Sequence, residues 1–315
     1  GLPRRETRDG YSVVRRSSSV KILGNTISRG VARFLRRAQN FDVVHAHSHL
    51  YFSTNLAALA RRVGDVPLAI TNHGLYSQNA PEWLFDLYLR SVGRWTFNQA
   101  DVVFCYTEED RERVRQFGVE SPIDVVANGI DTDRFTPAGP TSDRINHEGP
   151  VVLFVGRLVE GKRPQDAIKA VSRLPSNLDA RLYVVGDGKI RTELEAMAAD
   201  NVEFLGQVPY DEMPGIYRAG DVLVLPSRAE GVPRTVLEAF ASGVPVVSSH
   251  LEHTASVVQQ AGETVPVGDV EGYRMALERV LHNPSLGSTG RDVAVEAFRW
   301  ETTVEQTTQA LRDLL

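Results

Sequence analysis

Short apolar runs alternate with stretches of helical periodicity along the whole chain. Apolar runs bounded by turn residues are typical of buried strands, and the stretches between them are typical of crossover helices. The pattern therefore predicts an α/β fold built on parallel sheets. The predicted strands lie at 11–17, 42–47, 67–73, 101–107, 124–128, 151–156, 181–186, 202–206, 222–226 and 244–249. The predicted helices lie near 24–39, 53–63, 81–99, 108–117, 164–174, 189–199, 210–219, 233–242, 271–282 and 301–315.

One segment interrupts this alternation. Residues 136–150 are rich in proline, glycine and polar side chains and show no periodicity, which favours an interdomain linker. The chain has 315 residues, enough for two domains. We therefore expect an N-terminal domain over 1–136, a linker over 137–150 and a second domain over 151–299.

The segment 226–247 combines a strand end, a loop, a helix start and a second strand in the sequence PSRAEGVPRTVLEAFASGVPVV. Pro233 suits the first helical position, because its missing N–H has no partner there. The unpaired amides of a first helical turn attract a phosphate or diphosphate. Here they are the backbone N–H groups of Arg234, Thr235 and Val236.

Two acidic residues flank this helix start. Glu230 lies in the preceding loop, and Glu238 lies eight residues later inside the helix. Carboxylates accept hydrogen bonds from sugar hydroxyls. A diphosphate with hydroxyl groups on either side describes a nucleotide sugar, so the segment predicts a nucleotide-sugar site. The alternative is a pair of surface acids that cap the helix and pair with Arg234.

A second loop supplies positive charge. The sequence VVLFVGRLVEGK at 151–162 predicts a buried strand, a turn at Gly156, and then Arg157 and Lys162. Ligands of open α/β sheets bind beyond the carboxyl ends of the strands, where this loop lies. Two fixed cations there could neutralise the charge that develops on a departing nucleoside diphosphate. The alternative is an ordinary basic loop that contacts Glu160.

Together these segments resemble the retaining glycosyltransferases of family 4, which have the GT-B fold. The resemblance covers about residues 11–315 and rests on VGRLVEGK at 155–162, NGID at 128–131, GDGKIR at 186–191 and the E-x7-E spacing of 230–238. It implies two Rossmann-like, doubly wound α/β domains facing a cleft, with a helix at 300–315 crossing back to the first domain. The first domain is then the acceptor side, and the second binds the nucleotide sugar.

The resemblance also implies roles for individual residues. Glu238 is expected to bind the nucleotide ribose, and Glu230 the donor sugar or its surroundings. Arg157, Lys162 and the amides of 234–236 are expected to stabilise the diphosphate, with Gly156 forming the turn beside it.

Two glycine-containing turns remain open to more than one interpretation. The resemblance places Asn128 of the VANGID run at the cleft, on the acceptor side, although an Asn-Gly pair favours a tight turn anyway. Gly186 and Gly188 would let the backbone approach the nucleotide, although a plain strand–helix turn explains them nearly as well.

Histidines gather where two predicted strands end. His45, His47 and His49 lie in DVVHAHSHL, and His73 ends the following strand. Strand alternation sends residues 45 and 47 to one face. The resemblance implies that His47 faces the reacting sugar, with His45 and His73 on the acceptor side. The alternatives are structural histidines that bond to nearby backbone, or a metal site. We expect neither metal nor cofactor, because no acidic cluster accompanies the histidines and GT-B enzymes generally need no metal.

The sequence departs from the family pattern at two places. Family members usually begin with a strand, a glycine-rich loop and a helix that have no counterpart before residue 11, so we expect a truncated sequence or a misplaced start. The alternative is a shortened homologue, and either puts the activity of this form in doubt. After the strand at 244–249 the family usually has two glycines and, three residues later, a glutamate. Here these positions hold Glu252, His253 and Ser256, which puts donor contacts from this segment in doubt.

Charge is distributed unevenly. Residues 1–37 carry a formal charge of +8 within a chain whose total is −5. The stretch 24–40 places apolar residues at helical spacing among its arginines, and a basic amphipathic helix can lie on an anionic membrane. The alternative is a solvated helix that packs on a sheet. The acidic total argues against a dedicated nucleic-acid binder.

Cys105 is the single cysteine, which excludes an internal disulfide and a cysteine metal cluster. We expect it to be a small buried apolar residue. No apolar run approaches the roughly 18 residues needed to span a bilayer, and no signal peptide is visible. We interpret the protein as cytoplasmic, with possible contact at the inner face of the membrane.

The sequence thus predicts a retaining, hexosyl-type glycosyltransferase that moves a sugar from a nucleoside-diphosphate sugar to an acceptor hydroxyl. A lipid-linked or cell-envelope acceptor is the hypothesis that the basic first segment suggests. The alternative is a catalytically impaired nucleotide-sugar-binding or regulatory homologue. A dinucleotide oxidoreductase is disfavoured, because no G-x-G-x-x-G follows a strand with an acid about twenty residues on.

Overall fold

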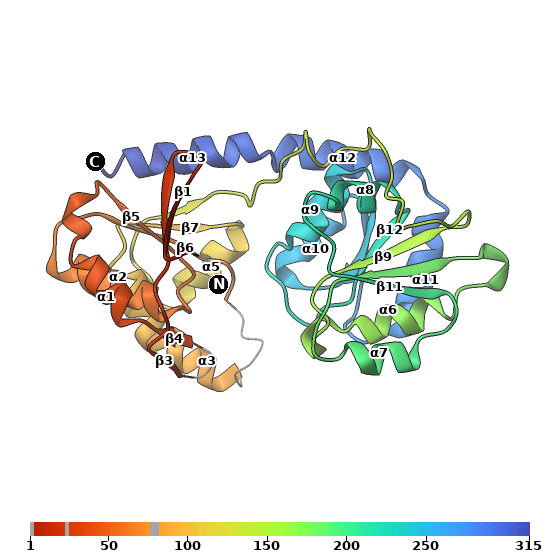
Figure 1. Ribbon diagram of the computed structural model, residues 1–315, viewed down its shortest axis with the longest axis horizontal. Helices are drawn as coiled ribbons and strands as arrows, with labels where there is room; N and C mark the ends of the chain where they lie inside the picture. The colour runs from red at the N-terminus through yellow and green to blue at the C-terminus, as the bar shows by residue number, and fades with distance from the viewer. Residues whose placement is uncertain (1–2, 23–24, 76–81) are drawn as a thin grey trace. The chain divides into compact units, whose positions relative to one another are not determined.

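The structure is a computed structural model of the 315-residue chain and describes residues 3–22, 25–75 and 82–315 (Figure 1). The chain divides into two compact units. The first comprises residues up to Val126 together with Gln306–Leu315, and the second comprises Ala127–Glu305. Each is an α/β unit with its own apolar core.

The first unit is built on a four-stranded parallel sheet whose strands follow chain order. The strands are β5 (Val44–His47), β6 (Leu68–Thr71), β7 (Val102–Cys105) and β8 (Ile123–Val125). The helices are α1 (Arg29–Leu35), α2 (Phe52–Val63), α3 (Glu82–Tyr88), α4 (Arg94–Phe97) and α5 (Glu108–Gln116), with a 3-10 turn at Ala38–Asn40 and a π-helical turn at Leu89–Gly93. The Thr107 side chain caps α5 by accepting from the Asp110 amide at 3.1 Å.

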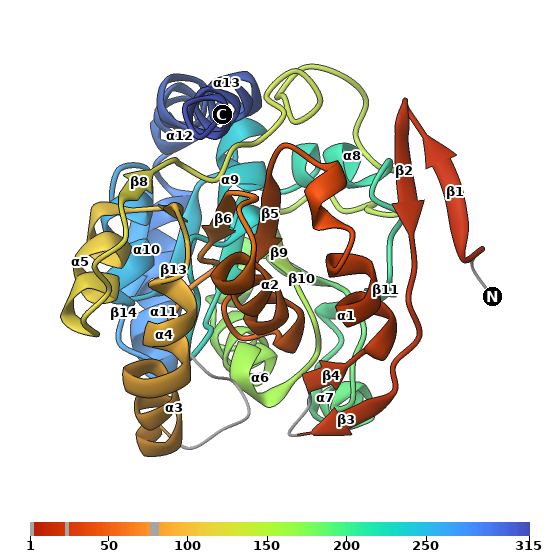
Figure 2. The same ribbon diagram turned by 90° about the vertical axis from the view of Figure 1, so that its left-hand side faces the viewer.

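Two antiparallel hairpins precede this sheet. The strand predicted at 11–17 contains one of their strands, but the other three were missed, and the helix predicted from residue 24 begins only at Arg29. The hairpins pair β1 (Arg5–Arg8) with β2 (Tyr11–Val14), and β3 (Val20–Ile22) with β4 (Asn25–Ile27). Figure 2 shows both in red, outside the parallel strands. Asp9 and Gly10 both have positive φ, 45° and 85°, as a two-residue hairpin turn requires. The Asp-Gly pair was the sequence signal for this turn.

The second unit is built on a six-stranded parallel sheet. Its strands are β9 (Val151–Val155), β10 (Arg181–Val185), β11 (Val202–Gly206), β12 (Val222–Leu225), β13 (Val246–Ser249) and β14 (Gly262–Val265). Their spatial order is β11-β10-β9-β12-β13-β14. Counted from β9, this is the 3-2-1-4-5-6 order of the doubly wound dinucleotide-binding fold. Five of the six strands were predicted, and β14 was not.

Helices of the second unit follow the strands in the expected alternation (Figure 1). They are α6 (Pro164–Val171), α7 (Arg191–Met197), α8 (Met213–Arg218), α9 (Arg234–Ala241), α10 (Glu252–Val258), α11 (Val270–Leu281) and α12 (Ser285–Ala297), with 3-10 turns at Glu160–Lys162 and Ser176–Leu178. The sequence pattern missed α10 and α12. Two glycines lower the helical propensity of α12, yet tertiary packing requires them. A Cβ on Gly287 would lie 2.4 Å from the Gly243 carbonyl oxygen, and one on Gly290 would lie 3.0 Å from the Phe240 ring.

The last helix, α13 (Trp300–Arg312), returns the chain to the first unit. Ala310, Leu311 and Leu314 pack against a small apolar cluster of that unit. The cluster consists of Ala69, Val102, Phe104 and Val126.

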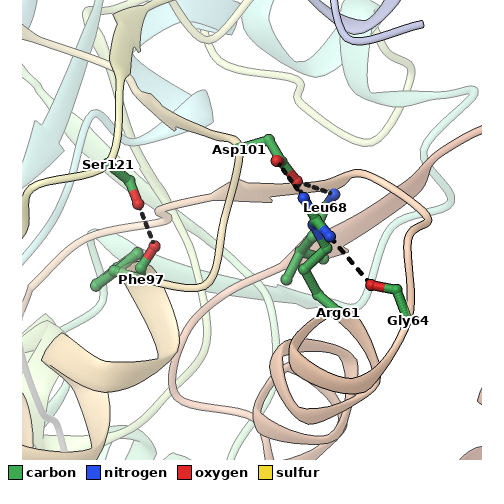
Figure 3. Close-up of polar contacts among 6 residues, drawn as sticks. All are labelled: Arg61, Gly64, Leu68, Phe97, Asp101 and Ser121. Carbon is green, nitrogen blue, oxygen red and sulfur yellow. Dashed lines mark hydrogen bonds and ion pairs between the residues drawn. The ribbon is translucent and has the colours of Figure 1, made fainter.

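The connection between α2 and the parallel sheet depends on one carboxylate (Figure 3). Asp101, immediately before β7, accepts from the Arg61 guanidinium through both oxygens, at 2.8 and 2.9 Å. It also accepts from the Leu68 amide at 2.8 Å, while Arg61 donates to the Gly64 carbonyl at 3.0 Å. These bonds fix the end of α2 and the starts of β6 and β7. The bidentate Arg61 contact is the main reason that the pKa of Asp101 lies below its ordinary value.

Replacing Asp101 with Asn should lower the free energy of unfolding by about 1–2 kcal/mol at neutral pH, since the pair is partly exposed and bonds to charged groups contribute in this range. A carboxylate with a lowered pKa stabilises the fold above its ordinary pKa, and this stabilisation is lost as pH falls through the lowered value. The deficit should therefore shrink in acid. Urea unfolding at pH 7 and near pH 3 measures it, with the exposed Asp124→Asn as control. An equal deficit at both pH values would contradict the assignment.

Candidate active site

Strand order defines where a ligand can bind in the second unit. The chain winds outward from β9 in one direction and from β12 in the other, so the two loops that follow these neighbouring strands diverge. Ligands of such sheets bind at this switch point, beyond the carboxyl ends of the strands. The loop after β9 carries Arg157 and Lys162, and the loop after β12 carries Glu230. The predicted donor residues of both loops therefore lie at the switch point.

Close backbone packing shapes the loop after β9. The Gly156 and Leu158 amides donate to the Val185 and Asp187 carbonyls, each at 2.9 Å. A Cβ on Gly186, whose φ is +134°, would lie 1.9 Å from the Gly156 carbonyl oxygen. The loop after β10 thus presses directly against the loop after β9.

The same packing explains the second glycine of the GDG run. A Cβ on Gly188 would lie 2.1 Å from the Leu158 carbonyl oxygen. Both glycines are therefore required by contact between two protein loops. A backbone approach to a nucleotide at Gly186 and Gly188 stays a prediction.

Two contacts join the loop after β9 to the loop after β12. The Arg228 amide donates to the Gly161 carbonyl at 2.8 Å. The Lys162 ammonium forms an ion pair with Oε1 of Glu230. Both side chains of this pair are largely buried, with 14% and 7% of their surfaces exposed. An ion pair removed from water is retained only when the partners satisfy one another.

Arg157 in the same loop is exposed.

The helix start differs slightly from the prediction. Pro233 is the N-cap in an extended conformation, and the first residue of α9 is Arg234. The Val236 amide donates to the Pro233 carbonyl at 3.0 Å, so Val236 does not present a free amide. The Arg234 and Thr235 amides precede the first intrahelical bonds of α9.

Two buried hydroxyls lie in this segment, one in the loop after β12 and one on the first turn of α9. Within the described part of the chain, neither the Ser227 hydroxyl nor the Thr235 hydroxyl has a hydrogen-bond partner. Buried polar atoms are nearly always paired in folded proteins, so such exceptions need an explanation. A bound ligand with donors and acceptors of its own would supply the missing partners.

Glu238 lies on the second turn of α9 and is 6% exposed. The Tyr217 hydroxyl donates to its Oε2 at 2.8 Å, and the Arg234 guanidinium lies 3.8 Å from its Oε1. Burial raises the pKa of Glu238, while Tyr217 and Arg234 act in the opposite direction. Arg234 also donates to the Tyr210 hydroxyl at 2.7 Å. The prediction of two acids beside the helix start thus corresponds to two buried carboxylates with different partners.

In the first unit, three adjacent strand ends bring together a chain of polar rings. Tyr106 bonds to His73 through Nδ1 at 2.7 Å, and His73 bonds to His47 through Nε2 at 3.1 Å. His45 bonds to the Thr71 hydroxyl at 2.8 Å, and its ring lies 4.5 Å from that of His47. His45 and His47 therefore share one face, as alternation predicted.

Burial lowers the pKa of each of these histidines. The pKa of His45 falls to about 4 through burial and the nearby rings of His47 and His73. Burial also lowers the pKa of His47 and of His73, and His47 lowers that of His73 further. These imidazoles are consequently neutral at pH 7 and present one donor and one acceptor nitrogen each. No group of three or more His, Cys, Asp or Glu residues in the described ranges is arranged to hold a metal ion.

Comparison with known proteins gives the family. Residues 2–134 match the family described as Glycosyltransferase Family 4, and residues 149–283 match Glycosyl transferases group 1. A D-inositol 3-phosphate glycosyltransferase of Acidothermus cellulolyticus is 31% identical over 316 residues, which cover 90% of this chain and 70% of the relative. The chain belongs to the family 4 glycosyltransferases.

Other relatives and solved structures agree with this assignment. A GDP-mannose-dependent alpha-(1-6)-phosphatidylinositol monomannoside mannosyltransferase of Mycolicibacterium smegmatis is 28% identical, over 94% of this chain and 82% of the relative. A sucrose-phosphate synthase from Thermosynechococcus elongatus matches with a TM-score of 0.81 at 22% identity, over 99% of this chain and 86% of that one. Anabaena HepE in complex with UDP-glucose matches with a TM-score of 0.77 at 21% identity, over 91% and 82% of the two chains. The prediction of a GT-B glycosyltransferase is confirmed.

The structure also describes the surroundings of three further motif positions, Gly129, Asn128 and Glu252. A Cβ on Gly129 would lie 2.5 Å from the Thr303 hydroxyl and 2.8 Å from Cα of Trp300, so this glycine permits close packing on α13. The neighbouring Asn128 is half-buried, and its acceptor-side role stays a prediction. Glu252, where the family usually has a glycine, is exposed in the first turn of α10.

Three tyrosines that hydrogen-bond to these site residues were not identified from the sequence. Tyr106 follows β7 directly, so its place at a strand end could have suggested it, as for His47. Tyr217 and Tyr210 gave no signal, because an aromatic residue near a helix is indistinguishable from a core residue by pattern alone. His49 is fully buried among aromatic rings, and burial lowers its pKa to about 3.

Replacing Gly186 with Ala should destabilise the second unit severely, by roughly 4 kcal/mol or more, because backbone rather than a flexible side chain blocks the new Cβ. Chemical denaturation followed by circular dichroism measures the loss. Gly161→Ala is the matched control in the facing loop, since no heavy atom lies within 4 Å of its Cβ position. If both variants unfolded at the same denaturant concentration, the two loops would not be packed as described.

Proposed function

We propose that the chain is a retaining glycosyltransferase that transfers a hexosyl group from a nucleoside-diphosphate sugar to an acceptor hydroxyl. The observation that carries the proposal is the buried ion pair between Lys162 and Glu230, which joins the two switch-point loops beside the start of α9. The cation and the helix amides suit the diphosphate of such a donor, and the carboxylate suits its sugar hydroxyls.

The diphosphate is assigned to Lys162, Arg157, the turn at Gly156 and the amides that begin α9. Amides at a helix start and cationic side chains both favour phosphate oxygens. The relatives named for GDP-mannose and the neighbour solved with UDP-glucose support a nucleotide-sugar donor. Glu238 then accepts from the nucleotide ribose, and Glu230 from the sugar hydroxyls.

The ion pair has a further consequence in this assignment. Without donor, Lys162 and Glu230 neutralise each other in a poorly hydrated place. When a diphosphate binds, Lys162 exchanges its carboxylate partner for phosphate oxygens, and Glu230 becomes available to sugar hydroxyls. One contact thus keeps both groups in position before the donor arrives.

The reaction breaks the bond between the anomeric carbon and the diphosphate oxygen, and the electron pair leaves with the diphosphate. The acceptor oxygen forms the new bond at the anomeric carbon, and its proton passes to the departing diphosphate oxygen. Lys162 and Arg157 stabilise the charge that develops on the leaving group without a metal ion. An α-linked donor gives an α-glycoside when configuration is retained.

The first unit is assigned to the acceptor. His47, His45 and His73 are neutral at pH 7 and offer hydrogen-bonding nitrogens at the carboxyl edge of the parallel sheet. His47 and His73 are exposed and are therefore the members of the group that can reach a sugar hydroxyl.

The acceptor is assigned to the lipid-linked or cell-envelope class. Residues 1–37 carry a formal charge of +8, which favours an anionic surface. The relative named for phosphatidylinositol monomannoside supports the same class. No helix in the described ranges is long and apolar enough to cross a bilayer. We place the enzyme in the cytoplasm, in peripheral contact with the inner face of the membrane.

Lys162→Ala should slow sugar transfer by about one to two decades, because a charged hydrogen bond to the leaving group contributes about 1.5–3 kcal/mol and each 1.36 kcal/mol is tenfold in rate. Release of nucleoside diphosphate from a panel of donors measures transfer and hydrolysis together. Lys169→Ala, an exposed lysine on α6, is the control. Turnover of the Lys162 variant within twofold of the parent would remove its role.

Vesicle binding should increase with the fraction of anionic lipid and fall with added salt, because charge drives it and exposed charges are screened beyond about 10 Å at 0.1 M salt. Cosedimentation with neutral and anionic vesicles measures this binding. Arg36→Glu with Arg37→Glu should reduce binding to the anionic vesicles alone. Equal binding to both kinds of vesicle would refute the membrane assignment.

A further inference from the structure

Tyr217 is a buried tyrosine whose hydroxyl has the Glu238 carboxylate as its hydrogen-bond partner. It lies on α8, is fully buried, and donates to Oε2 of Glu238 at 2.8 Å. Its ring also packs edge-on against Phe135, with centroids 5.8 Å apart. A phenylalanine would make the same ring contacts, so the hydroxyl serves the carboxylate. A buried phenol usually finds such a partner.

This contact makes the two oxygens of the Glu238 carboxylate unequal. Oε2 receives the Tyr217 hydroxyl, whereas the Arg234 guanidinium lies 3.8 Å from Oε1, beyond hydrogen-bond distance. The Tyr210 hydroxyl is a further hydrogen-bonding neighbour of this carboxylate. Arg234 is itself exposed and bonds to the Tyr210 hydroxyl, so it is not committed to the carboxylate. Oε1 is therefore the oxygen that lies toward the exposed Arg234 side chain, the side from which a donor can approach.

Tyr217 also affects the charge of Glu238. Burial raises the pKa of this carboxylate, and the Tyr217 hydrogen bond opposes that effect by stabilising the ionised form. An ionised carboxylate accepts through both oxygens, whereas a protonated one must donate through one of them. The tyrosine thus favours the form that can accept from two neighbouring hydroxyls.

We propose that Tyr217 is a positioning residue for ribose recognition: it holds Oε2 of Glu238 so that Oε1 faces the hydroxyls of the nucleotide ribose. The proposal rests on the assignment of Glu238 to the ribose in the proposed function. Tyr217 itself is buried and touches no ligand, so it acts only through the carboxylate.

The test compares a ribonucleotide with its deoxy counterpart. Calorimetry measures the affinity of the whole protein for UDP and GDP and, for whichever binds more tightly, for the 2′,3′-dideoxy form. Tyr217→Phe should weaken binding of the ribonucleotide about ten- to hundredfold, since a hydrogen bond to a charged group is lost from the arrangement. Binding of the dideoxy form should change less than twofold, so the preference for ribose should largely disappear.

Glu238→Gln is the second variant of the test, because it changes the carboxylate itself. It should lose the same preference for ribose, and adding Tyr217→Phe to it should cause little further loss, because both changes act on one contact. Tyr273→Phe is the matched control, since it removes another buried phenol that bonds at 2.8 Å, to Ser249. It should leave the ratio of the two affinities unchanged. Thermal unfolding establishes that each variant is folded at the temperature used.

The outcomes distinguish a failure of the Tyr217 role from a failure of the proposed function. Equal weakening of both nucleotides by Tyr217→Phe would show a packing role only and would overturn the proposal, as would an unchanged ratio. If the parent protein bound neither UDP nor GDP, the proposed function would fail and the ribose assignment with it. That result is visible before any variant is measured.

Discussion

The ion pair between Lys162 and Glu230 is the interaction on which the second unit's site depends. It connects the two loops that diverge at the switch point of the six-stranded sheet, with the Arg228–Gly161 backbone bond beside it. A buried cation without a partner would be expensive, so each side chain keeps the other in place. In the proposed function, the positive charge that stabilises the leaving group is therefore already held in a poorly hydrated place before the donor binds.

Backbone packing gives these loops their shape. The loops after β9 and β10 approach so closely that no side chain fits at Gly186 or Gly188. The helix that follows β12 begins without a side-chain cap, and the buried hydroxyls of Ser227 and Thr235 have no partner in the described part of the chain. Backbone contacts therefore fix the conformation of the two loops, whereas two hydroxyls of the described residues are left without hydrogen-bond partners. A protein scaffold that is rigid in this way is suited to a polar ligand that completes its hydrogen bonds.

Much of this arrangement could be read from the sequence. The apolar runs identified five strands of the second sheet, and the loops that follow them carried the charged residues that the structure brings together. Patterns failed where tertiary contacts outweighed local preference, as in the glycine-containing α12. They also failed at the Asp9–Gly10 hairpin, where the turn signal was present but only the strand that follows it, at 11–17, was predicted. The hydrogen bond from Tyr217 to Glu238 could not be predicted, because only the folded chain shows which carboxylate accepts from this hydroxyl.

The single cysteine has a practical consequence. Cys105 lies buried in β7, and burial raises the pKa of its thiol to about 12, so almost none of it is thiolate at neutral pH. Thiolate is the form that reacts with maleimides and iodoacetamides. The natural chain therefore offers labelling reagents almost no background, and one engineered surface thiol would carry a fluorophore with high selectivity. Position 161, where a Cβ meets open space one residue from the lysine of the ion pair, is a place where such a dye could report donor arrival in real time.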